Sequence, residues 1–294
     1  MLLLVVMFLN DAKIKYLEET ANQIRKSIIE MLSEARSGHT AGPLDMADIL
    51  TALYFHLLKH DPKNPDWDGR DRLILSNGHI CPVLYATMAR AGYFPLAELK
   101  TLRKYGSPLQ GHPERDLLPG LETTSGPLGS GLSQAVGMCL ADRLDRGLAS
   151  ARYFYVLMSD GEMECGQTWE AAMLAGKEQL HNLVAIVDRN NIQIDGFTEE
   201  VMPLEPLREK WEAWNWHVIE IDGHNFEEID AAVGQAKSVF NRPTAIIAHT
   251  IPGKGVPQFE RRYEWHGKPP NKREAEKALQ ELRTFGGRIK HDDV

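Results

Sequence analysis

The sequence predicts an α/β fold in which a mostly parallel central sheet is covered by helices on both faces. Short apolar runs typical of buried strands alternate with longer segments in which apolar residues recur every three or four positions. The clearest unit spans residues 153–191, where an apolar run, a helical segment and a second apolar run follow one another. Such a unit places its two strands parallel, with a right-handed crossover. We expect one domain over residues 1–294, because neither a linker nor an internal repeat interrupts the alternation.

The first half of the chain is predicted to be mainly helical. Apolar residues at helical spacing predict a helix over residues 11–36, with Gly38 placed as its C-terminal cap. A short strand is expected over residues 73–75, and a polar turn follows it. The other elements expected here are helices over 44–58, 82–91, 96–104 and 132–146, and loops rich in Gly and Pro over 61–72 and 110–131.

The second half shows the regular alternation of strands and helices. Asn225 is expected to cap a helix, because its side chain can accept the unpaired N–H groups of a first turn. The expected strands are 153–158, 183–187, 216–221 and 244–249, and the expected helices are 167–177, 203–212, 225–239 and 271–285. Residues 251–270 are predicted to form an irregular loop, residues 1–10 an apolar N-terminal extension, and residues 286–294 a polar tail.

Composition excludes several classes of function. The formal net charge is -8 and no block of Lys and Arg is present, so we expect no nucleic-acid partner. Three cysteines without metal-like spacing favour a reducing, cytoplasmic location. The apolar start MLLLVVMFLN is too short to cross a bilayer, so we expect no membrane association. We favour an upstream start codon, or a segment that packs on a partner, over a membrane anchor.

Polar side chains follow the two strands of the clearest unit. Asp160 and Asn190 both lie just past a predicted strand, at the edge where open parallel sheets bind ligands. Carboxylate and amide oxygens suit Mg²⁺ or Ca²⁺ better than zinc. One formal charge is too little for a bare divalent ion, so the pattern predicts a metal that arrives with a phosphorylated ligand. The alternative is an aspartate that caps the next helix, followed by an Asn-Asn turn.

Four histidines stand next to glycines at predicted loop or strand ends, in SGHTAG, LSNGH, GHPE and EWHG. Imidazole passes protons near neutral pH and, when neutral, hydrogen-bonds hydroxyl groups. These residues are His39, His79, His112 and His266. The alternative for each is a surface turn residue. Residues 123–129, TTSGPLG, precede a helix, where glycines and helix amides favour an anion, although a plain tight loop would also fit.

The stretch SDGE…DRNNIQIDG resembles the thiamin-diphosphate signature, an Asp-Gly followed further on by an Asn-Asn. With LSNGH, GHPE and TTSGPLG, the chain from about Lys13 to Pro270 resembles the N-terminal half of transketolase. The resemblance implies a three-layer thiamin-diphosphate-binding fold. It implies that Asp160, the Asn190 side chain and the Ile192 carbonyl bind Mg²⁺, for which Ca²⁺ or Mn²⁺ could substitute. The cofactor-binding residues that it implies are His79, Gly126, Leu128, Asp160, Gly161, Glu162, Asn190, Ile192 and His266.

The resemblance also assigns catalytic roles, to His39, His79, His112, His266 and Glu170. By that resemblance His79 contacts the cofactor diphosphate, His112 the terminal hydroxyl of the donor sugar, and His39 and His266 assist proton movement. The implied reaction transfers a two-carbon ketol unit from a ketose or ketose phosphate to an aldose or aldose phosphate. His181, His217, His224 and His249 match no such position, and we interpret them as structural.

The sequence departs from the transketolase pattern at several positions and in its length. Ser159 replaces the usual glycine before Asp160, and Cys165 replaces a glutamate of the acid network that links two transketolase active sites. Glu170 matches a second glutamate of that network, and Glu164 stands next to Cys165. The chain is also much shorter than a whole transketolase. We therefore predict an N-terminal subunit that is active only with a second subunit carrying the pyrimidine-binding and C-terminal modules, in an α2β2 heterotetramer.

Two other functions are compatible with these motifs. The first is an alpha-type subunit of another two-chain thiamin-diphosphate enzyme, either a 2-oxo acid dehydrogenase or a biosynthetic ketol transferase. The dehydrogenase version should lack GHPE and LSNGH, and this chain has both. The second is a binding or regulatory relative that has kept the fold without the activity.

Overall fold

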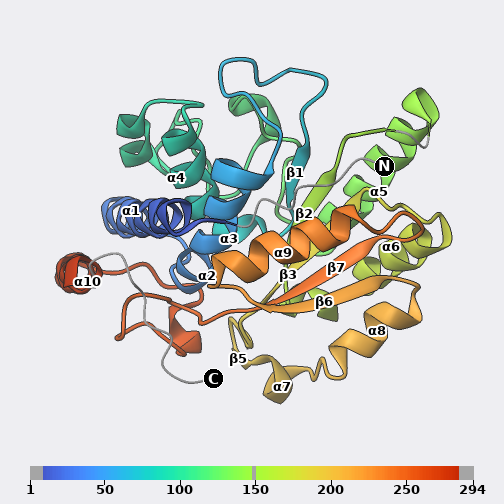
Figure 1. Cartoon of the computed structure of the whole chain (residues 1–294). Coiled ribbons are helices and arrows are strands. Elements are labelled where there is room, and N and C mark those ends of the chain that lie inside the picture. The colour runs from blue at the N-terminus through green and yellow to red at the C-terminus, as the bar shows by residue number, and fades with distance from the viewer. Residues whose placement is uncertain (1–8, 148–149, 285–294) are drawn as a thin grey trace.

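A computed structural model describes residues 9–147 and 150–284 of the chain, shown in Figure 1. The apolar extension, except for its last two residues, and the polar tail predicted over 286–294 lie outside the described residues. Helices cover both faces of a central sheet in Figure 1, which confirms the predicted three-layer α/β class.

The central sheet has five strands in the order β1-β2-β3-β7-β6, and every neighbouring pair is parallel. The strands are β1 (Arg72–Leu75), β2 (Phe154–Ser159), β3 (Leu183–Arg189), β6 (His217–Asp222) and β7 (Thr244–His249). All residues of β2 and β3 are buried, as expected for central strands covered on both faces. The predicted parallel pairing of these two strands is confirmed.

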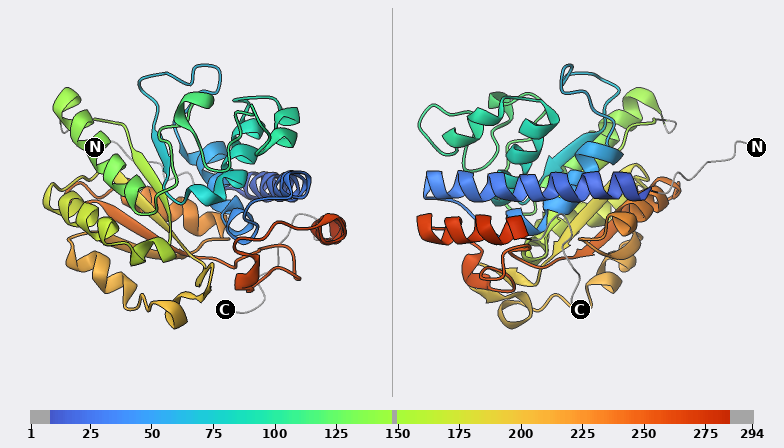
Figure 2. Two further views of the ribbon diagram at one scale, coloured as in Figure 1. Left: turned by 180° about the vertical axis from the view of Figure 1, so that it is seen from behind. Right: turned by 60° about the vertical axis from the view of Figure 1, so that its left-hand side comes forward.

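Alternate side chains of the strands point into two separate hydrophobic layers. Phe154, Val156 and Met158 of β2 pack with α5 (Ser130–Arg146), α6 (Gly166–Lys177) and α8 (Leu207–Ala213). Tyr155 and Leu157 belong to the opposite layer. That layer includes α1 (Asp11–Ala35), α3 (Ala47–Ala52), α4 (Cys81–Ala91), α9 (Phe226–Lys237) and α10 (Lys272–Thr284). Helices from the two ends of the chain, α1 and α10, lie side by side in Figure 2. The side-chain amide of Asn22 in α1 donates to the Leu282 carbonyl in α10 at 3.0 Å.

Most predicted elements are present within a few residues of their expected bounds, and the exceptions have local causes. The helix predicted over 44–58 is instead α2 (Ala41–Asp45), α3 and a π-helical turn over Leu53–Leu57, because Met46 departs from helical geometry. The helix predicted over 96–104 is a 3₁₀ segment, Leu96–Thr101. Pro206 precedes α8, which therefore begins at Leu207 rather than at residue 203.

Two features near the functional edge were not predicted. Strands β4 (Ile192–Gln193) and β5 (Gly196–Phe197) form a small antiparallel hairpin, and α7 (Thr198–Val201) follows it.

The predicted C-terminal cap of α1 is wrong by two residues. Arg36 occupies the left-handed cap position at φ 51°, and Gly38 lies in the following turn at φ 127°.

His224 has a structural role, as predicted. Its Nδ1 lies 2.8 Å from Asp48 Oδ2, and its Nε2 accepts the N–H of Ile251 at 2.9 Å, so the neutral ring donates to Asp48. Asp48 also receives Arg25 at 2.9 Å and 2.6 Å. Burial alone would raise the pKa of Asp48, but Arg25 and His224 lower it below its usual range. This network ties α1 to α3 and to the loop after β7.

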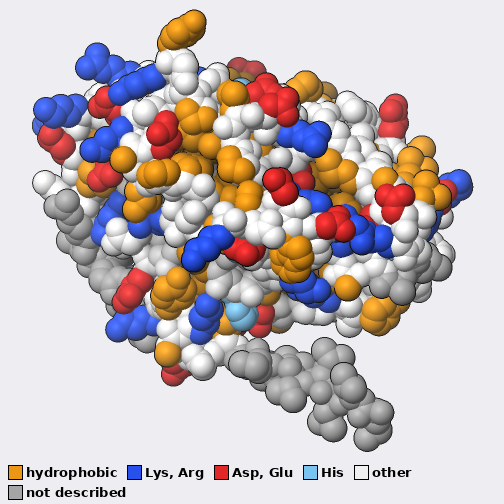
Figure 3. Space-filling model, turned by 90° about the horizontal axis from the view of Figure 1, so that it is seen from above, with side chains coloured by type: hydrophobic (Ala, Val, Ile, Leu, Met, Phe, Trp, Pro, Cys, Tyr) orange, Lys and Arg blue, Asp and Glu red, His pale blue; other side chains and the backbone are white. Residues whose placement is uncertain are grey.

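The surface shows the mixed character that the composition predicts. On the face seen in Figure 3, acidic and basic side chains are interspersed and hydrophobic side chains gather between them. Among the described residues, none of the helices combines the length and apolar character that a bilayer crossing requires.

Candidate active site at the carboxyl edge of the sheet

The register of β2 and β3 brings the two predicted metal-binding segments together. Ser159 pairs with Asp188, and the N–H of Asp160 donates to the Asp188 carbonyl at 3.0 Å. The N–H of Asn191 donates to Asp160 Oδ2 at 2.7 Å. A direct hydrogen bond therefore links Asp160 to the residue that follows Asn190, as the strand-end argument predicts.

Asp160 is fully buried, and its carboxylate accepts three hydrogen bonds. Oδ1 accepts the N–H of Gly161 at 2.7 Å, and Oδ2 accepts both Asn191 N–H and Nη1 of Arg189, the latter at 3.1 Å. Burial raises the pKa of Asp160 to about 6, while Arg189 and the two N–H groups act in the opposite direction. The carboxylate is held by backbone groups on both oxygens, so its position does not depend on the arginine alone.

Two buried carboxyl groups orient the amide of Asn190. Its Nδ2 donates to Asp188 Oδ2 at 2.9 Å and to Asp45 Oδ2 at 3.1 Å, and its Oδ1 accepts Ile192 N–H at 3.1 Å. Since only acceptors surround the nitrogen, the amide oxygen is turned away from the acids. This oxygen is the atom that a cation would require.

Asp45 and Asp188 were not predicted as part of the site. Burial raises the pKa of Asp188 to about 8, and burial together with Asp188 raises the pKa of Asp45 well above its usual range. Thr250, at the end of β7, donates to Asp188 Oδ1 at 2.5 Å. Asp188 could have been suspected as a charged residue inside a buried strand, whereas nothing local to Asp45 connects it with Asn190.

Three of the four singled-out histidines form one cluster. The ring centroids of His39 and His79 are 5.0 Å apart, those of His79 and His266 are 5.1 Å apart, and those of His39 and His266 are 5.6 Å apart. Burial lowers the pKa of His39 to about 4 and lowers those of His79 and His266, so the rings are neutral at pH 7. Nδ1 of His39 is buried without a partner, which leaves it available for a ligand.

His112 lies at the border of this cluster. A Cβ on Gly78 would meet Ser125 Oγ at 2.6 Å and His112 Cδ2 at 3.2 Å, so only glycine permits this close approach between the two loops. His112 lowers the pKa of both His39 and His79, and burial lowers its own. The structure thus brings together the four histidines of SGHTAG, LSNGH, GHPE and EWHG. His224, which also follows a glycine, lies outside the cluster, against Asp48.

The glycine loop is fastened to the same edge of the sheet by Glu162. This carboxylate is fully buried and accepts Gly129 N–H at 2.5 Å, Ser159 N–H at 3.3 Å and the hydroxyl of Ser76. The Ser76 oxygen in turn accepts Gly131 N–H at 3.1 Å in the first turn of α5. The side chain of Glu162 is thus turned into the protein, and its assignment to cofactor binding stays a prediction. Leu128 is partly exposed, and Gly126 precedes it in the same loop.

The residues of the predicted acid network lie on α6 and just before it. Cys165 is partly exposed at the N-terminal cap of α6, and burial with the nearby Glu162 and Glu164 raises the pKa of its thiol. Glu164 accepts from Gln193 Nε2 at 2.8 Å. Glu170 is exposed on α6.

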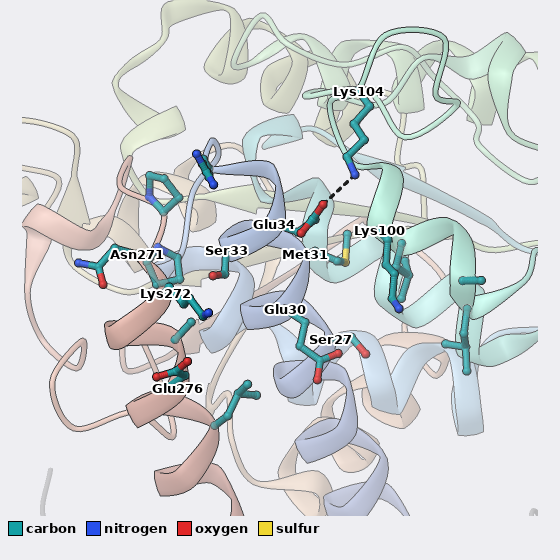
Figure 4. A pocket seen from close by; sticks show the side chains of 18 of the residues that line it. Ser27, Glu30, Met31, Ser33, Glu34, Lys100, Lys104, Asn271, Lys272 and Glu276 are labelled. Carbon is teal, nitrogen blue, oxygen red and sulfur yellow. Dashed lines mark hydrogen bonds and ion pairs between the residues drawn. The ribbon is translucent and has the colours of Figure 1, made fainter.

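A large groove, separate from the predicted site, lies between α1, the 3₁₀ segment 96–101 and α10, as Figure 4 shows. Glu34 and Lys104 form an ion pair across it at 2.8 Å. The groove is lined by acidic and basic side chains together and by none of the predicted site residues. It gives no competing assignment for the active site.

Similarity to known proteins identifies the family of the chain. Residues 17–286 match the sequence family described as "Transketolase, thiamine diphosphate binding domain". The chain therefore belongs to the thiamin-diphosphate-binding domain family of transketolases, which confirms the predicted fold and the predicted class of transketolase-type transferase.

Two similar curated proteins are themselves subunits. The "6-deoxy-6-sulfo-D-fructose transketolase subunit SqwG" of Clostridium sp. (strain MSTE9) is 44% identical over 270 residues, which cover 92% of this chain and 97% of that protein. One of the subunits of the apulose-4-phosphate transketolase of Phocaeicola vulgatus is 39% identical, over 92% of this chain and 95% of its own length.

The solved structures that resemble the chain are longer. Transketolase from Campylobacter jejuni superposes with a TM-score of 0.85 at 38% identity, over 91% of this chain but only 42% of the other. A Pichia stipitis transketolase in complex with sedoheptulose-7-phosphate gives a TM-score of 0.86 at 35% identity, over 92% of this chain and 41% of that one. The chain thus corresponds to less than half of these transketolases.

Proposed function

We propose that the chain is the cofactor-binding subunit of a two-chain transketolase that transfers a two-carbon ketol unit from a ketose to an aldose. The observation that carries this proposal is the convergence of neutral His39, His79 and His266 within 5.6 Å of one another. Neutral imidazoles both donate and accept hydrogen bonds, so they can bind several hydroxyl groups and move protons between them. The family membership supplies the class of reaction.

The residues at the sheet edge fit a divalent metal with a diphosphate. Asp160 supplies one carboxylate, and Asn190 supplies an amide oxygen whose orientation is fixed by Asp45 and Asp188. With the Ile192 carbonyl these are hard oxygen donors, which suit Mg²⁺ and also Ca²⁺ or Mn²⁺. The small formal charge of this set leaves room for the negative oxygens of thiamin diphosphate, which when bound supplies the electron sink for carbon–carbon bond chemistry.

The remaining assignments follow the transketolase resemblance. His79 would hold the diphosphate together with backbone groups of Gly126, Leu128 and Gly161, close to the first turn of α5. His112 would contact the terminal hydroxyl of the donor sugar. His39 and His266 would hold and move protons on the substrate. Glu170 would belong to the acid network that reaches the partner.

A second subunit fits the exposed apolar side chains at the rim of the site. Ile194, Phe197 and Met202, which follow Asn190, are 61%, 38% and 56% exposed. Ile194 Cδ1 would lie 3.5 Å, and His39 Cδ2 3.9 Å, from a Cβ on Gly267, so the rim borders the histidine cluster. We propose that this rim faces a partner subunit with the pyrimidine-binding and C-terminal modules, in an α2β2 assembly located in the cytoplasm.

The two subunit relatives narrow the substrate class. One is named for 6-deoxy-6-sulfo-D-fructose and the other for apulose-4-phosphate. Both are ketoses with an anionic group at the end of the chain. We propose a donor of this class, a ketose that carries a terminal phosphate or sulfonate.

The test is a screen of ketose donors and aldose acceptors with the chain alone and with its co-purified partner. Two-carbon transfer that requires both chains, Mg²⁺ and thiamin diphosphate is the expected result. Normal turnover of a ketose by the isolated chain would refute the two-chain assignment. Calorimetry that detects no binding of thiamin diphosphate with Mg²⁺, with or without the partner, would instead favour a non-catalytic relative.

A further inference from the structure

Arg189 is a buried cation next to the proposed metal site. It is the last residue of β3, and its side chain is only 3% exposed. Its Nη1 donates to Asp160 Oδ2 at 3.1 Å and to Thr198 Oγ1 at 2.9 Å. Its Nη2 donates to Glu199 at 2.7 Å and to Glu205 at 2.9 Å. The guanidinium therefore bridges Asp160 and the segment that contains α7.

The three carboxylates around Arg189 differ in their surroundings. Asp160 is fully buried, whereas the side chains of Glu199 and Glu205 are 41% and 57% exposed. The guanidinium thus lies between one inner carboxylate, which a metal would use, and two outer carboxylates at the surface. A divalent cation beside Asp160 would be repelled by the guanidinium, and the outer pair offsets that repulsion.

Asp160 does not need the arginine to stay in place. Gly161 N–H and Asn191 N–H each donate to its carboxylate at 2.7 Å, one to each oxygen. Removal of the guanidinium charge would therefore leave the carboxylate oriented and remove a competitor for its oxygen. This separates an electrostatic role of Arg189 from a role in fixing the geometry of Asp160.

We propose that Arg189 acts electrostatically, as the internal counter-ion of Asp160, and that Glu199 and Glu205 set the metal affinity by drawing its guanidinium outward. The inference rests on the proposed metal site. It gives the loop before α8 a function in the affinity for metal, although neither glutamate is a metal ligand.

The two sides of this arrangement predict opposite effects. In Arg189→Met the repelling charge is lost, and we expect divalent metal to bind about 10-fold more tightly, the size of effect that a neighbouring charge has on a buried group. In the double variant Glu199→Gln and Glu205→Gln the guanidinium is free to bind Asp160, and we expect binding about 3- to 10-fold weaker. Glutamine still accepts Leu204 N–H and Leu207 N–H, which these two residues bind now.

The experiment titrates the full-length chain with Mn²⁺ in the presence of thiamin diphosphate. Electron paramagnetic resonance measures the concentration of free Mn²⁺, which gives the affinity for the metal. Arg208→Met is the matched control, because Arg208 also pairs with two glutamates, Glu212 and Glu220, but on the surface. If Arg189→Met does not fold, Arg189→Gln removes the same charge and keeps a donor.

The outcomes separate the inference from the function on which it rests. Tighter binding in the arginine variant and weaker binding in the double glutamate variant, with the control unchanged, would support the inference. A wild-type chain that binds Mn²⁺ while the variants bind it equally, or both more weakly, would overturn the inference alone. A wild-type chain that binds no Mn²⁺ with the cofactor, both alone and with its co-purified partner, would overturn the proposed metal site itself.

Discussion

The two halves of the candidate site satisfy their polar groups to different degrees. At the strand ends, every side-chain oxygen and nitrogen of Asp160, Asp188 and Asn190 is hydrogen-bonded, and only Oδ1 of the neighbouring Asp45 has no partner among the described residues. In the histidine cluster, the rings lie 5.0 to 5.6 Å apart, and Nδ1 of His39 has no partner. Buried polar groups are normally paired, because an unpaired one costs free energy. The difference indicates that the strand ends are built for fixed geometry and the histidines for a ligand with many hydroxyl groups.

The largest effect is expected at the strand ends. In Asp160→Asn the only carboxylate among the proposed ligands is lost, and the amide oxygen can accept only one of the two backbone N–H groups that the carboxylate binds now. We expect the affinity for thiamin diphosphate with Mg²⁺ to fall by about 100-fold or more, beyond the loss typical of outer partners. Isothermal titration calorimetry measures it, with circular dichroism as the check on folding. Unchanged affinity in a folded variant would remove Asp160 from the site.

A smaller loss of cofactor affinity is expected when Asp188, which orients the proposed ligand Asn190, is replaced. Asp188 orients the amide of Asn190 without being a proposed ligand, and such outer partners typically contribute about 10- to 100-fold in metal affinity. Asp188→Asn should therefore weaken Mg²⁺-dependent cofactor binding within this range. The same calorimetric titration measures it, and Asp222→Asn, a strand-end aspartate on β6, is the control. A loss as large as that of Asp160→Asn would mean that Asp188 is itself a ligand.

The histidine cluster should affect how the free energy of unfolding depends on pH. The folded-state pKa of His39 is lowered to about 4, so the unfolded chain takes up the proton first as pH falls below about 6.5. Stability linked to His39 is thus present above pH 6.5 and is lost as pH falls toward 4. Between pH 7 and pH 5, His39→Gln should lose about 1–2 kcal/mol less free energy of unfolding than the wild type. Urea unfolding at the two pH values measures the difference.

The pH dependence of the free energy of unfolding must be compared between the variant and the wild type, because the contribution of Asp188 depends on pH in the opposite direction. Its folded-state pKa is raised to about 8, so its contribution decreases as pH rises from about 4 to 8 in both proteins. Equal pH slopes for His39→Gln and the wild type would show that His39 is not held in its neutral form.

The smallest effect is expected for a histidine outside the cluster. His249 is 53% exposed and pairs with Glu220 at the surface. His249→Ala should change the free energy of unfolding by less than about 0.5 kcal/mol and leave cofactor affinity unchanged. Thermal unfolding and the same calorimetric titration measure both. Reduced cofactor affinity in this variant would extend the site beyond His39, His79, His112 and His266.

Much of the fold could be predicted from local patterns. The unbroken apolar runs of β2 and β3 specify strands that are buried on both faces, and their connection by a helix specifies parallel pairing. Breaks within helices were harder to predict. The kink at Met46 and the late start of α8 depend on packing and on proline, which compete with the helical periodicity used for prediction.

The sequence by itself determined that Asp160 and Asn190 reach the same edge of a sheet, because parallel strands end on one side and the spacing fixes one helix between them. It also indicated which histidines to consider, since the motifs SGHTAG, LSNGH, GHPE and EWHG resemble transketolase, whereas His224, also beside a glycine, has no such match. Only the tertiary structure decided that Asp45 lies against Asn190 and that Arg189 joins Asp160 to Glu199 and Glu205. Contacts between side chains distant in sequence depend on how the helices pack on the sheet, and the local periodicity of the sequence does not specify that packing.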